Sequence, residues 1–236
     1  MNESVFVCKE FSIVQNSSVL KLGTDAMILG CLTDFYNPSH ILDIGTGTGI
    51  LTLMMAQKYD AQFTAIDISE ESYTCALHNF KQSKWANNII CKQISLQEFC
   101  TSTNQVFDGI ICNPPFFSDS LHNKNNLKTI ARHTITLSPI DLFACAYSLL
   151  SNQGILSIII PCSEKQTFCH QALYTNLHII KEIEISPYYE TPPNRIILQF
   201  SKTWKSVQRT HIAIRNKDKT YSKEYKGLTE KFISIN

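Results

Sequence analysis

The chain has 236 residues, 44% of them hydrophobic, and a net charge of +1, so it is long enough for one large domain with a substantial core. Its longest apolar runs, such as "ILSIIIP", fall far short of the roughly 20 residues that a membrane span needs, and the acidic start "MNESVFVCKEF" is not typical of a signal peptide. Nine cysteines without a CxxC pair argue against a disulfide framework and a zinc site, so we expect reduced thiols, no metal and a cytoplasmic location.

From about residue 41 the chain alternates short apolar runs with helix-length segments. Strands are expected at 40–45, 62–67, 88–94, 106–113, 155–161, 178–187 and 195–201. Helices are expected at 49–59, 69–83 and 138–154, the last ending at Gly154. This alternation predicts an α/β fold, a doubly wound parallel sheet with helices on both faces, whose last two strands form an antiparallel hairpin at one edge.

The segment "LDIGTGTGIL" joins the first of these strands to the first helix and places glycines at 45, 47 and 49. Glycine allows unusual torsions and a close approach of the backbone to a ligand. Ile50 stands where a dinucleotide-binding loop needs Gly or Ala, and no GK[ST] follows, so neither a pyrophosphate loop nor a P-loop is predicted. Asp43 precedes the loop, and Asp67 ends the second strand, where a ribose diol would lie. The alternative is a tight turn with Asp67 as a helix cap.

The fourth strand runs into Asn113, Pro114, Pro115 and two phenylalanines. In a doubly wound sheet this strand end and the glycine loop face one crevice. The Asn113 side chain and the Pro114 carbonyl offer two acceptors for a substrate –NH2 group, which they would hold in a fixed orientation. Phe116 offers a face on which a base can stack, whereas Phe117 is expected to pack. The alternative is a proline turn with two buried phenylalanines.

The glycine loop with Asp67 resembles the class I methyltransferases that use S-adenosylmethionine. The resemblance implies a Rossmann-like seven-stranded sheet with the last strand antiparallel. It also implies that the three glycines wrap the amino-acid part of the cofactor, that Asp67 holds its ribose, and that Asp43 supports the loop. The tetrad Asn-Pro-Pro-Phe resembles the motif of methyltransferases that act on planar amino groups, in adenine or in a glutamine side chain.

Three further segments narrow the resemblance: "KLGTDAMILGCL" (21–32), "ARHTITLSP" (131–139) and "HIAIRNKDKTYSKEYKGLTEKF" (211–232). Together with "NPPFF" they resemble the bacterial tRNA adenine-N6 methyltransferases that modify adenosine 37 of valine-accepting tRNA, over essentially the whole chain. By that resemblance Lys21, Thr24 and Asp25 approach the methionine end of the cofactor or the target. Ser95 stands where members of the family often carry an acid for the cofactor's adenine. The alternative for "GTDAMILG" is a helix that only packs on the sheet.

The resemblance implies tRNA as the partner, with no membrane, metal or obligate protein partner. Residues 194–236 carry 10 Lys and Arg against 3 Asp and Glu, whereas residues 1–193 carry 11 against 17, which is typical of a segment that meets a polyanion. The basic residues expected to bind RNA phosphates are Lys124, Lys128, Arg132, Lys202, Lys205, Arg209, Arg215, Lys217, Lys219, Lys223 and Lys226. A solvated surface without a partner is the alternative.

We expect a single methyltransferase domain over 1–236, with an N-terminal segment at 1–39, a Rossmann-like core at 40–201 and a basic C-terminal extension at 202–236 packed on the core. A methyltransferase of another RNA or DNA adenine, or of a protein glutamine side chain, shares the tetrad. The glutamine enzymes carry a helical domain before the glycine loop, for which 40 residues are too few, and no segment is left for a DNA-reading domain. An RNA-binding module on an inactive fold is opposed by the intact glycine loop, Asp67 and Asn113.

Overall fold

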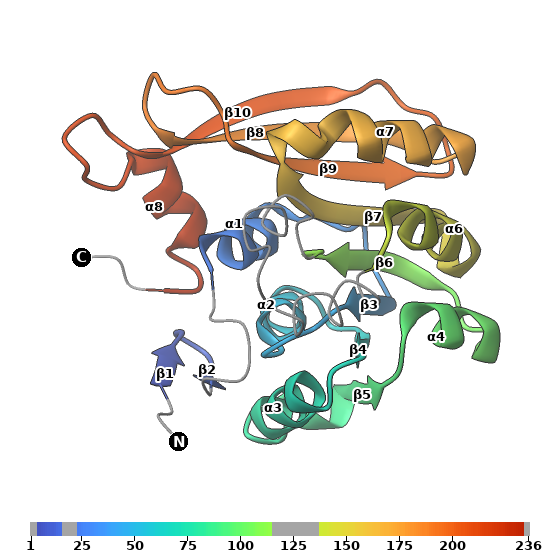
Figure 1. Cartoon of the computed structure of the whole chain (residues 1–236). Helices are drawn as coiled ribbons and strands as arrows, with labels where there is room; N and C mark the ends of the chain where they lie inside the picture. The colour runs from blue at the N-terminus through green and yellow to red at the C-terminus, as the bar shows by residue number, and fades with distance from the viewer. Residues whose placement is uncertain (1–3, 16–22, 115–136, 234–236) are drawn as a thin grey trace, which may run out of the picture.

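The computed structural model describes residues 4–15, 23–114 and 137–233. An eight-stranded sheet runs through the molecule, with helices on both of its faces (Figure 1). In sheet order the strands are β10 (Gln208–Arg215), β8 (His178–Tyr188), β9 (Arg195–Ser201), β7 (Leu150–Pro161), β6 (Phe107–Cys112), β3 (His40–Ile44), β4 (Gln62–Asp67) and β5 (Ile89–Gln93). β9 is antiparallel to both of its neighbours, and the remaining pairs of this sheet are parallel.

The parallel strands end along one edge of the sheet, which we call the carboxyl edge, and begin along the opposite amino edge. In the centre the register aligns Ile44 of β3 with Cys112 of β6 and with Ile66 of β4. β9 runs the other way and therefore begins at the carboxyl edge, where Arg195 pairs with Pro161, the last residue of β7. Ligands of doubly wound folds bind outside the carboxyl ends of the strands, so this edge is where a site is expected.

The helices divide into two layers. Side chains of α1 (Thr24–Leu32), α2 (Ile50–Lys58), α3 (Glu70–Lys81) and α8 (Lys223–Thr229) form one core with one face of the sheet. Side chains of α4 (Leu96–Ser102), α6 (Pro139–Leu149) and α7 (Lys165–Tyr174) form a second core on the other face (Figure 1). Neighbouring strand residues serve opposite cores, as Ile41 and Leu42 of β3 do, because side chains alternate along a strand.

A two-stranded hairpin, β1 (Ser4–Val7) and β2 (Ser12–Gln15), stands apart from the large sheet and packs against α3. The hairpin lies in the segment 1–39, for which the sequence predicted no strands. Its Phe11 and Ile13 are buried in the same core as α3.

All seven expected strands are present, and the seventh, β9, is antiparallel as expected. The C-terminal segment adds an eighth strand, β10, which pairs in parallel with β8. The edge strand on this side of the sheet is therefore β10, and the β8–β9 hairpin lies inside it, unlike the hairpin expected from the sequence. The helix expected at 138–154 ends at Leu149, and β7 begins at the next residue. A Cβ added at Gly154 would lie 2.8 Å from the carbonyl oxygen of Phe107, so this glycine allows β7 to approach β6 closely and does not end the helix.

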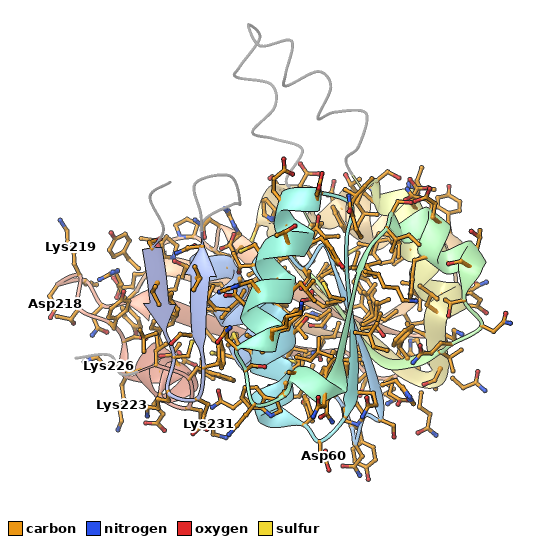
Figure 2. All side chains as sticks on the ribbon, turned by 90° about the horizontal axis from the view of Figure 1, so that it is seen from below. Asp60, Asp218, Lys219, Lys223, Lys226 and Lys231 are labelled. Atoms are coloured by element: carbon orange, nitrogen blue, oxygen red, sulfur yellow. The ribbon has the colours of Figure 1, made fainter. Side chains whose placement is uncertain are left out.

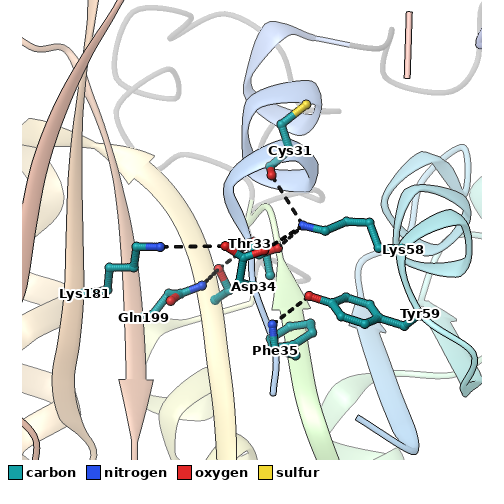
Figure 3. A network of polar contacts seen from close by, with 9 residues as sticks. Cys31, Thr33, Asp34, Phe35, Lys58, Tyr59, Lys181 and Gln199 are labelled. Carbon is teal, nitrogen blue, oxygen red and sulfur yellow. Dashed lines mark hydrogen bonds and ion pairs between the residues drawn. The ribbon is translucent and has the colours of Figure 1, made fainter. Parts of the chain in front are cut away.

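A polar network holds the amino edge together (Figure 3). The Lys58 ammonium donates to the carbonyl oxygens of Cys31 and Thr33 at the end of α1, and it pairs with the carboxylate of Asp34 at 3.2 Å. The Thr33 hydroxyl shares a 2.8 Å hydrogen bond with the hydroxyl of Ser157 in β7. Lys58, in the last turn of α2, thus donates to carbonyl oxygens that the end of α1 leaves without helical partners. These contacts stabilise the fold at the amino edge, away from the crevice.

Candidate active site

The glycine loop has the torsions that only glycine adopts readily. Gly45, Gly47 and Gly49 have φ angles of +70°, +57° and +85°. A Cβ added at Gly49 would lie 2.5 Å from the ring of Phe80, so α3 packs directly against this residue. At Gly45 and Gly47 no described atom lies within 4 Å of an added Cβ. The loop is therefore pressed against α3 at its third glycine and open at the first two.

Asp43 supports the loop from beneath. Its side chain is 1% exposed, and its Oδ2 accepts hydrogen bonds from the Thr46 hydroxyl (2.7 Å), the Thr52 hydroxyl (2.7 Å) and the Thr52 N–H (3.2 Å). Its Oδ1 is buried without a partner among the described residues. Burial raises the pKa of Asp43 to about 6, although the threonine hydrogen bonds oppose this shift. One carboxylate thus joins β3, the glycine loop and the first turn of α2.

Asp67 lies beside the same loop, at the end of β4. Its Oδ2 accepts from the Gly47 N–H at 2.9 Å, and its Oδ1 accepts from the Ser69 N–H at 2.9 Å. Burial raises the pKa of Asp67, and the hydrogen bonds from the backbone of Ser69 and Gly47 work against that rise. Each carboxylate oxygen has a second lone pair, so Asp67 can accept further hydrogen bonds from a ligand.

Asn113 and Pro114 follow β6 directly. Because Cys112 is aligned with Ile44 across β6 and β3, Asn113 lies next to the first glycine of the loop. The Asn113 Oδ1 is buried and has no hydrogen-bond partner among the described residues. A buried acceptor without a partner destabilises a fold by about 1–3 kcal/mol, so its retention needs a reason beyond stability. Pro114 is buried as well.

Ser95 is bound to its own helix. It begins α4 in a capping box: its hydroxyl accepts from the Glu98 N–H at 3.2 Å and donates to the Glu98 carboxylate at 2.7 Å. A hydroxyl has one donor and two lone pairs, so a single acceptor position is left for a ligand. The sequence "SLQE" is typical of a capping box, so this helix start is also visible in the sequence.

Thr24 and Asp25 begin α1, and Thr24 is exposed. The Asp25 carboxylate accepts from the Arg195 Nε at 2.9 Å. Because Arg195 pairs with Pro161 at the end of β7, this ion pair brings the start of α1 to the carboxyl edge. The structure therefore places Thr24 and Asp25 on the side of the sheet where Asn113 and Gly45 lie.

Asn79 is a site residue that sequence reasoning missed. It lies on α3, is 1% exposed, and its side chain donates to the carbonyl oxygens of Thr48 (2.8 Å) and Val14 (3.0 Å) while accepting from the Val14 N–H (2.9 Å). Its amide therefore ties the glycine loop to the N-terminal hairpin. In the sequence, Asn79 falls on the same helix face as the apolar residues Cys75, Ala76 and Phe80. A polar side chain in a core is normally hydrogen-bonded, so this position could have indicated a structural contact.

The basic residues of the C-terminal segment do not share one side. Arg215 ends β10 at the carboxyl edge, and Lys217 in the following loop forms an ion pair with Glu190. Lys223 begins α8 directly after Ser222, which donates hydrogen bonds to the carbonyl oxygens of Ala213 and Ile214 near the end of β10, and Figure 2 shows the Lys223 side chain on the side of Asp60. The remaining predicted site residues, which lie outside the described residues, are Lys21, Phe116, Lys124, Lys128 and Arg132.

In the described ranges, no three or more His, Cys, Asp and Glu side chains are arranged to hold a metal ion. None of the nine cysteines, all of which lie in the described ranges, forms a disulfide. None of the helices built from described residues is long and apolar enough to cross a membrane.

Comparison with known proteins gives a consistent result. The sequence matches the methyltransferase small domain family over residues 17–184. It is 35% identical over 230 residues to the tRNA1(Val) (adenine(37)-N6)-methyltransferase of Flavobacterium psychrophilum, covering 97% of this chain and 98% of that protein. The protein of the same name from Vibrio parahaemolyticus is 34% identical, with 96% and 94% covered. The structure of a predicted O-methyltransferase, Atu636 from Agrobacterium tumefaciens, shares the fold with a TM-score of 0.68 at 16% identity, over 88% of this chain and 96% of that one.

Proposed function

The chain belongs to the tRNA1(Val) (adenine(37)-N6)-methyltransferase family, and on this premise we propose that it uses S-adenosylmethionine to methylate the N6 amine of adenosine 37 in the anticodon loop of a valine tRNA. We further propose that residues 1–236 form one methyltransferase domain that acts in the cytoplasm on tRNA. The observation that carries the chemical part of the proposal is the buried Oδ1 of Asn113, which has no partner among the described residues and lies beside the glycine loop.

The glycine loop fits S-adenosylmethionine. Gly45 and Gly47 leave open the space that a Cβ would fill, so a ligand can approach their backbone closely. Asp67 offers its second lone pairs to the ribose hydroxyls, and Ser95 offers one acceptor position to the adenine amine. Asp43 holds the loop in place through Thr46 and Thr52. Thr24 and Lys21 are proposed for the methionine end.

Asn113 and Pro114 position the target. When bound, S-adenosylmethionine supplies an electrophilic methyl group. The Asn113 Oδ1 and the Pro114 carbonyl accept the two N–H bonds of the adenine amine, which aims its nitrogen lone pair toward the glycine loop. Orientation of this kind lowers a barrier by up to about 7–11 kcal/mol at the ideal limit. The proton leaves after the transfer, so no general base is needed, and Phe116 stacks on the adenine.

The role of Asn113 is tested by separating binding from turnover. The Asn113→Ala variant is expected to lose at least about 100-fold in turnover on tRNA, because a misplaced amine forfeits the orientation. Its dissociation constant for the cofactor, measured by calorimetry, stays within about threefold of the wild-type value. The matched control is Asn152→Ala, an exposed asparagine at the start of β7, which retains both. Lost cofactor binding with normal turnover of the residual complex would show that the proposed role is wrong.

A further inference from the structure

The carboxyl edge continues well beyond the proposed crevice. After Asn113 at the end of β6, the edge passes Pro161 at the end of β7 and Arg195 at the start of β9. It then reaches Tyr188 at the end of β8 and Arg215 at the end of β10, which are register partners. Neighbouring strands are about 4.8 Å apart, so Tyr188 lies three strands, about 14 Å across the sheet, from Asn113. The register aligns Cys112 with Glu182 through β7 and β9, so Tyr188 also lies five residues, about 17 Å, farther along the strand direction, and the two residues are about 22 Å apart.

Two adjacent tyrosines lie at this far end. Tyr188 and Tyr189 are 38% and 57% exposed. The other exposed tyrosine and tryptophan side chains of the described residues lie at the amino edge. Tyr36, Tyr147 and Tyr174 precede the starts of β3, β7 and β8, and Trp204 follows the end of the antiparallel β9. Exposed aromatic area on the side of the proposed site is therefore concentrated, within the described ranges, at the turn after β8.

The turn that carries these tyrosines is ordered by its own hydrogen bonds. Thr191 donates to the Tyr188 carbonyl with its N–H (3.2 Å) and its hydroxyl (2.7 Å), and Glu190 between them has a φ angle of +63°. The Tyr189 N–H donates to the Arg215 carbonyl at 2.7 Å. The loop after β8 and the loop after β10 therefore lie side by side, as Figure 1 shows at the ends of these strands.

The second loop supplies cations. The Arg215 guanidinium lies 4.1 Å from the ring centroid of Tyr221 and donates to the Lys219 carbonyl at 2.7 Å, so its position is set before any ligand arrives. Lys217 and Lys219 are exposed. Lys217 pairs with Glu190, but both side chains are more than 60% exposed, and such surface pairs are weak enough to exchange for a phosphate.

We propose that Tyr188, Tyr189, Arg215, Lys217 and Lys219 form an RNA-docking surface that binds the single-stranded nucleotides flanking the target adenosine. This inference rests on the proposed function and assigns it a second contact region on the same edge. A base stacks on Tyr189, and the three cations bind phosphates of the same strand. A stack of aromatic and basic groups suits single-stranded RNA, whose unpaired bases expose their faces.

The spacing fits a short segment of RNA. A stacked strand advances about 3.4 Å per nucleotide, so the distance of about 22 Å between Asn113 and Tyr188 corresponds to about six to seven nucleotides. An adenine bound at Asn113 and a base bound at Tyr189 can therefore belong to one loop. Basic residues at the amino edge, such as Lys205 after β9, lie on the opposite side of the sheet and are not part of this surface.

Two single variants of the full-length protein test the docking surface, each with a control of the same residue type at the amino edge. Tyr189→Ala is compared with Tyr174→Ala, and Lys219→Ala with Lys205→Ala. Tyr189→Ala is expected to weaken tRNA binding about 5- to 150-fold in a filter-binding assay, the range of one lost base stack. Lys219→Ala is expected to reduce the slope of log K against log salt by about 0.7, the value for one phosphate contact on a single strand.

The cofactor separates this inference from the proposed function. All four variants are expected to bind S-adenosylmethionine as the wild type does, and the two controls are expected to bind tRNA as the wild type does. If the wild type methylates tRNA and Tyr189→Ala and Lys219→Ala match their controls, the docking surface is refuted and the proposed function stands. If the wild type neither binds nor methylates tRNA, both fail.

Discussion

Replacement of Gly49 by alanine separates two reasons for a glycine in the loop. Gly49 has a φ angle of +85°, and a Cβ added there would lie 2.5 Å and 2.8 Å from two atoms of the Phe80 ring. A left-handed conformation disfavours a residue with a Cβ by about 1–2 kcal/mol. Phe80 is 2% exposed and cannot move into solvent, so the overlap adds about 1–3 kcal/mol. The expected loss in unfolding free energy is therefore about 2–5 kcal/mol.

Gly45→Ala is the matched control, because it has a similar φ angle of +70° with no described atom within 4 Å of the added Cβ. It is expected to lose only about 1–2 kcal/mol of stability. Its methyl group, however, enters the space proposed for the cofactor, so it should weaken cofactor binding more than its stability loss suggests. Gly49→Ala is thus expected to act mainly on the unfolding free energy, and Gly45→Ala mainly on the affinity for the cofactor.

Urea denaturation of both variants gives the two free energies, and calorimetry gives the cofactor affinities. The double variant Gly49→Ala with Phe80→Leu should recover about 1–3 kcal/mol relative to the sum of the single changes, because leucine removes the ring atoms that the Cβ meets. Equal stability losses for Gly49→Ala and Gly45→Ala, with no coupling to Phe80, would refute the packing argument.

Three further changes have expected outcomes. The pKa of Asp43 is raised from 3.8 to about 6, so the folded state binds this proton more tightly than the unfolded state does. The unfolding free energy of the wild type therefore falls by roughly 3 kcal/mol as pH rises from about 4 to 6. The Asp43→Asn variant should lack this pH dependence when its unfolding free energy is measured by urea denaturation across that range. Asn79→Ala removes the hydrogen bonds to the Val14 N–H and to the carbonyl oxygens of Val14 and Thr48, of which the Val14 carbonyl keeps the Cys75 thiol as a donor. The variant should be destabilised by about 2–4 kcal/mol and bind the cofactor more weakly, and unchanged values would contradict the link that Asn79 forms. Lys58→Met should lower the unfolding free energy by about 2–3 kcal/mol and leave kcat unchanged, because the contacts of Lys58 lie at the amino edge. A variant with a lower kcat and the stability of the wild type would show that the structural role given to Lys58 is wrong.

The parts of the site that could be predicted from sequence depend on local patterns. The glycine spacing, the acid at the end of β4 and the Asn-Pro-Pro stretch at the end of β6 each follow a short apolar run, and parallel strands bring their ends to one edge. The pairing of Ile44 with Cys112 and with Ile66 confirms that Gly45, Asp67 and Asn113 are neighbours.

The parts that were missed depend on contacts between distant segments. β10 pairs with β8, and Asn79 reaches Val14, 65 residues earlier, and neither partner is visible in the local pattern. A count of charges likewise does not say where the side chains point: it grouped Arg215, at the end of β10, with Lys223, whose side chain lies on the side of Asp60 in Figure 2. The capping box at Ser95 was readable, but its consequence for ligand binding needed the hydrogen bonds of Glu98.

The most direct test of the central claim is the modification state of valine tRNA. Nucleoside mass mapping compares tRNA from cells that lack the protein with tRNA from the same cells complemented by the wild type or by Asn113→Ala. We expect N6-methyladenosine at position 37 of valine tRNA in the wild-type complement, and unmodified adenosine there in the other two strains. Methylation of position 37 in all three strains, or methyl incorporation into protein or duplex DNA with none into tRNA, would contradict the account.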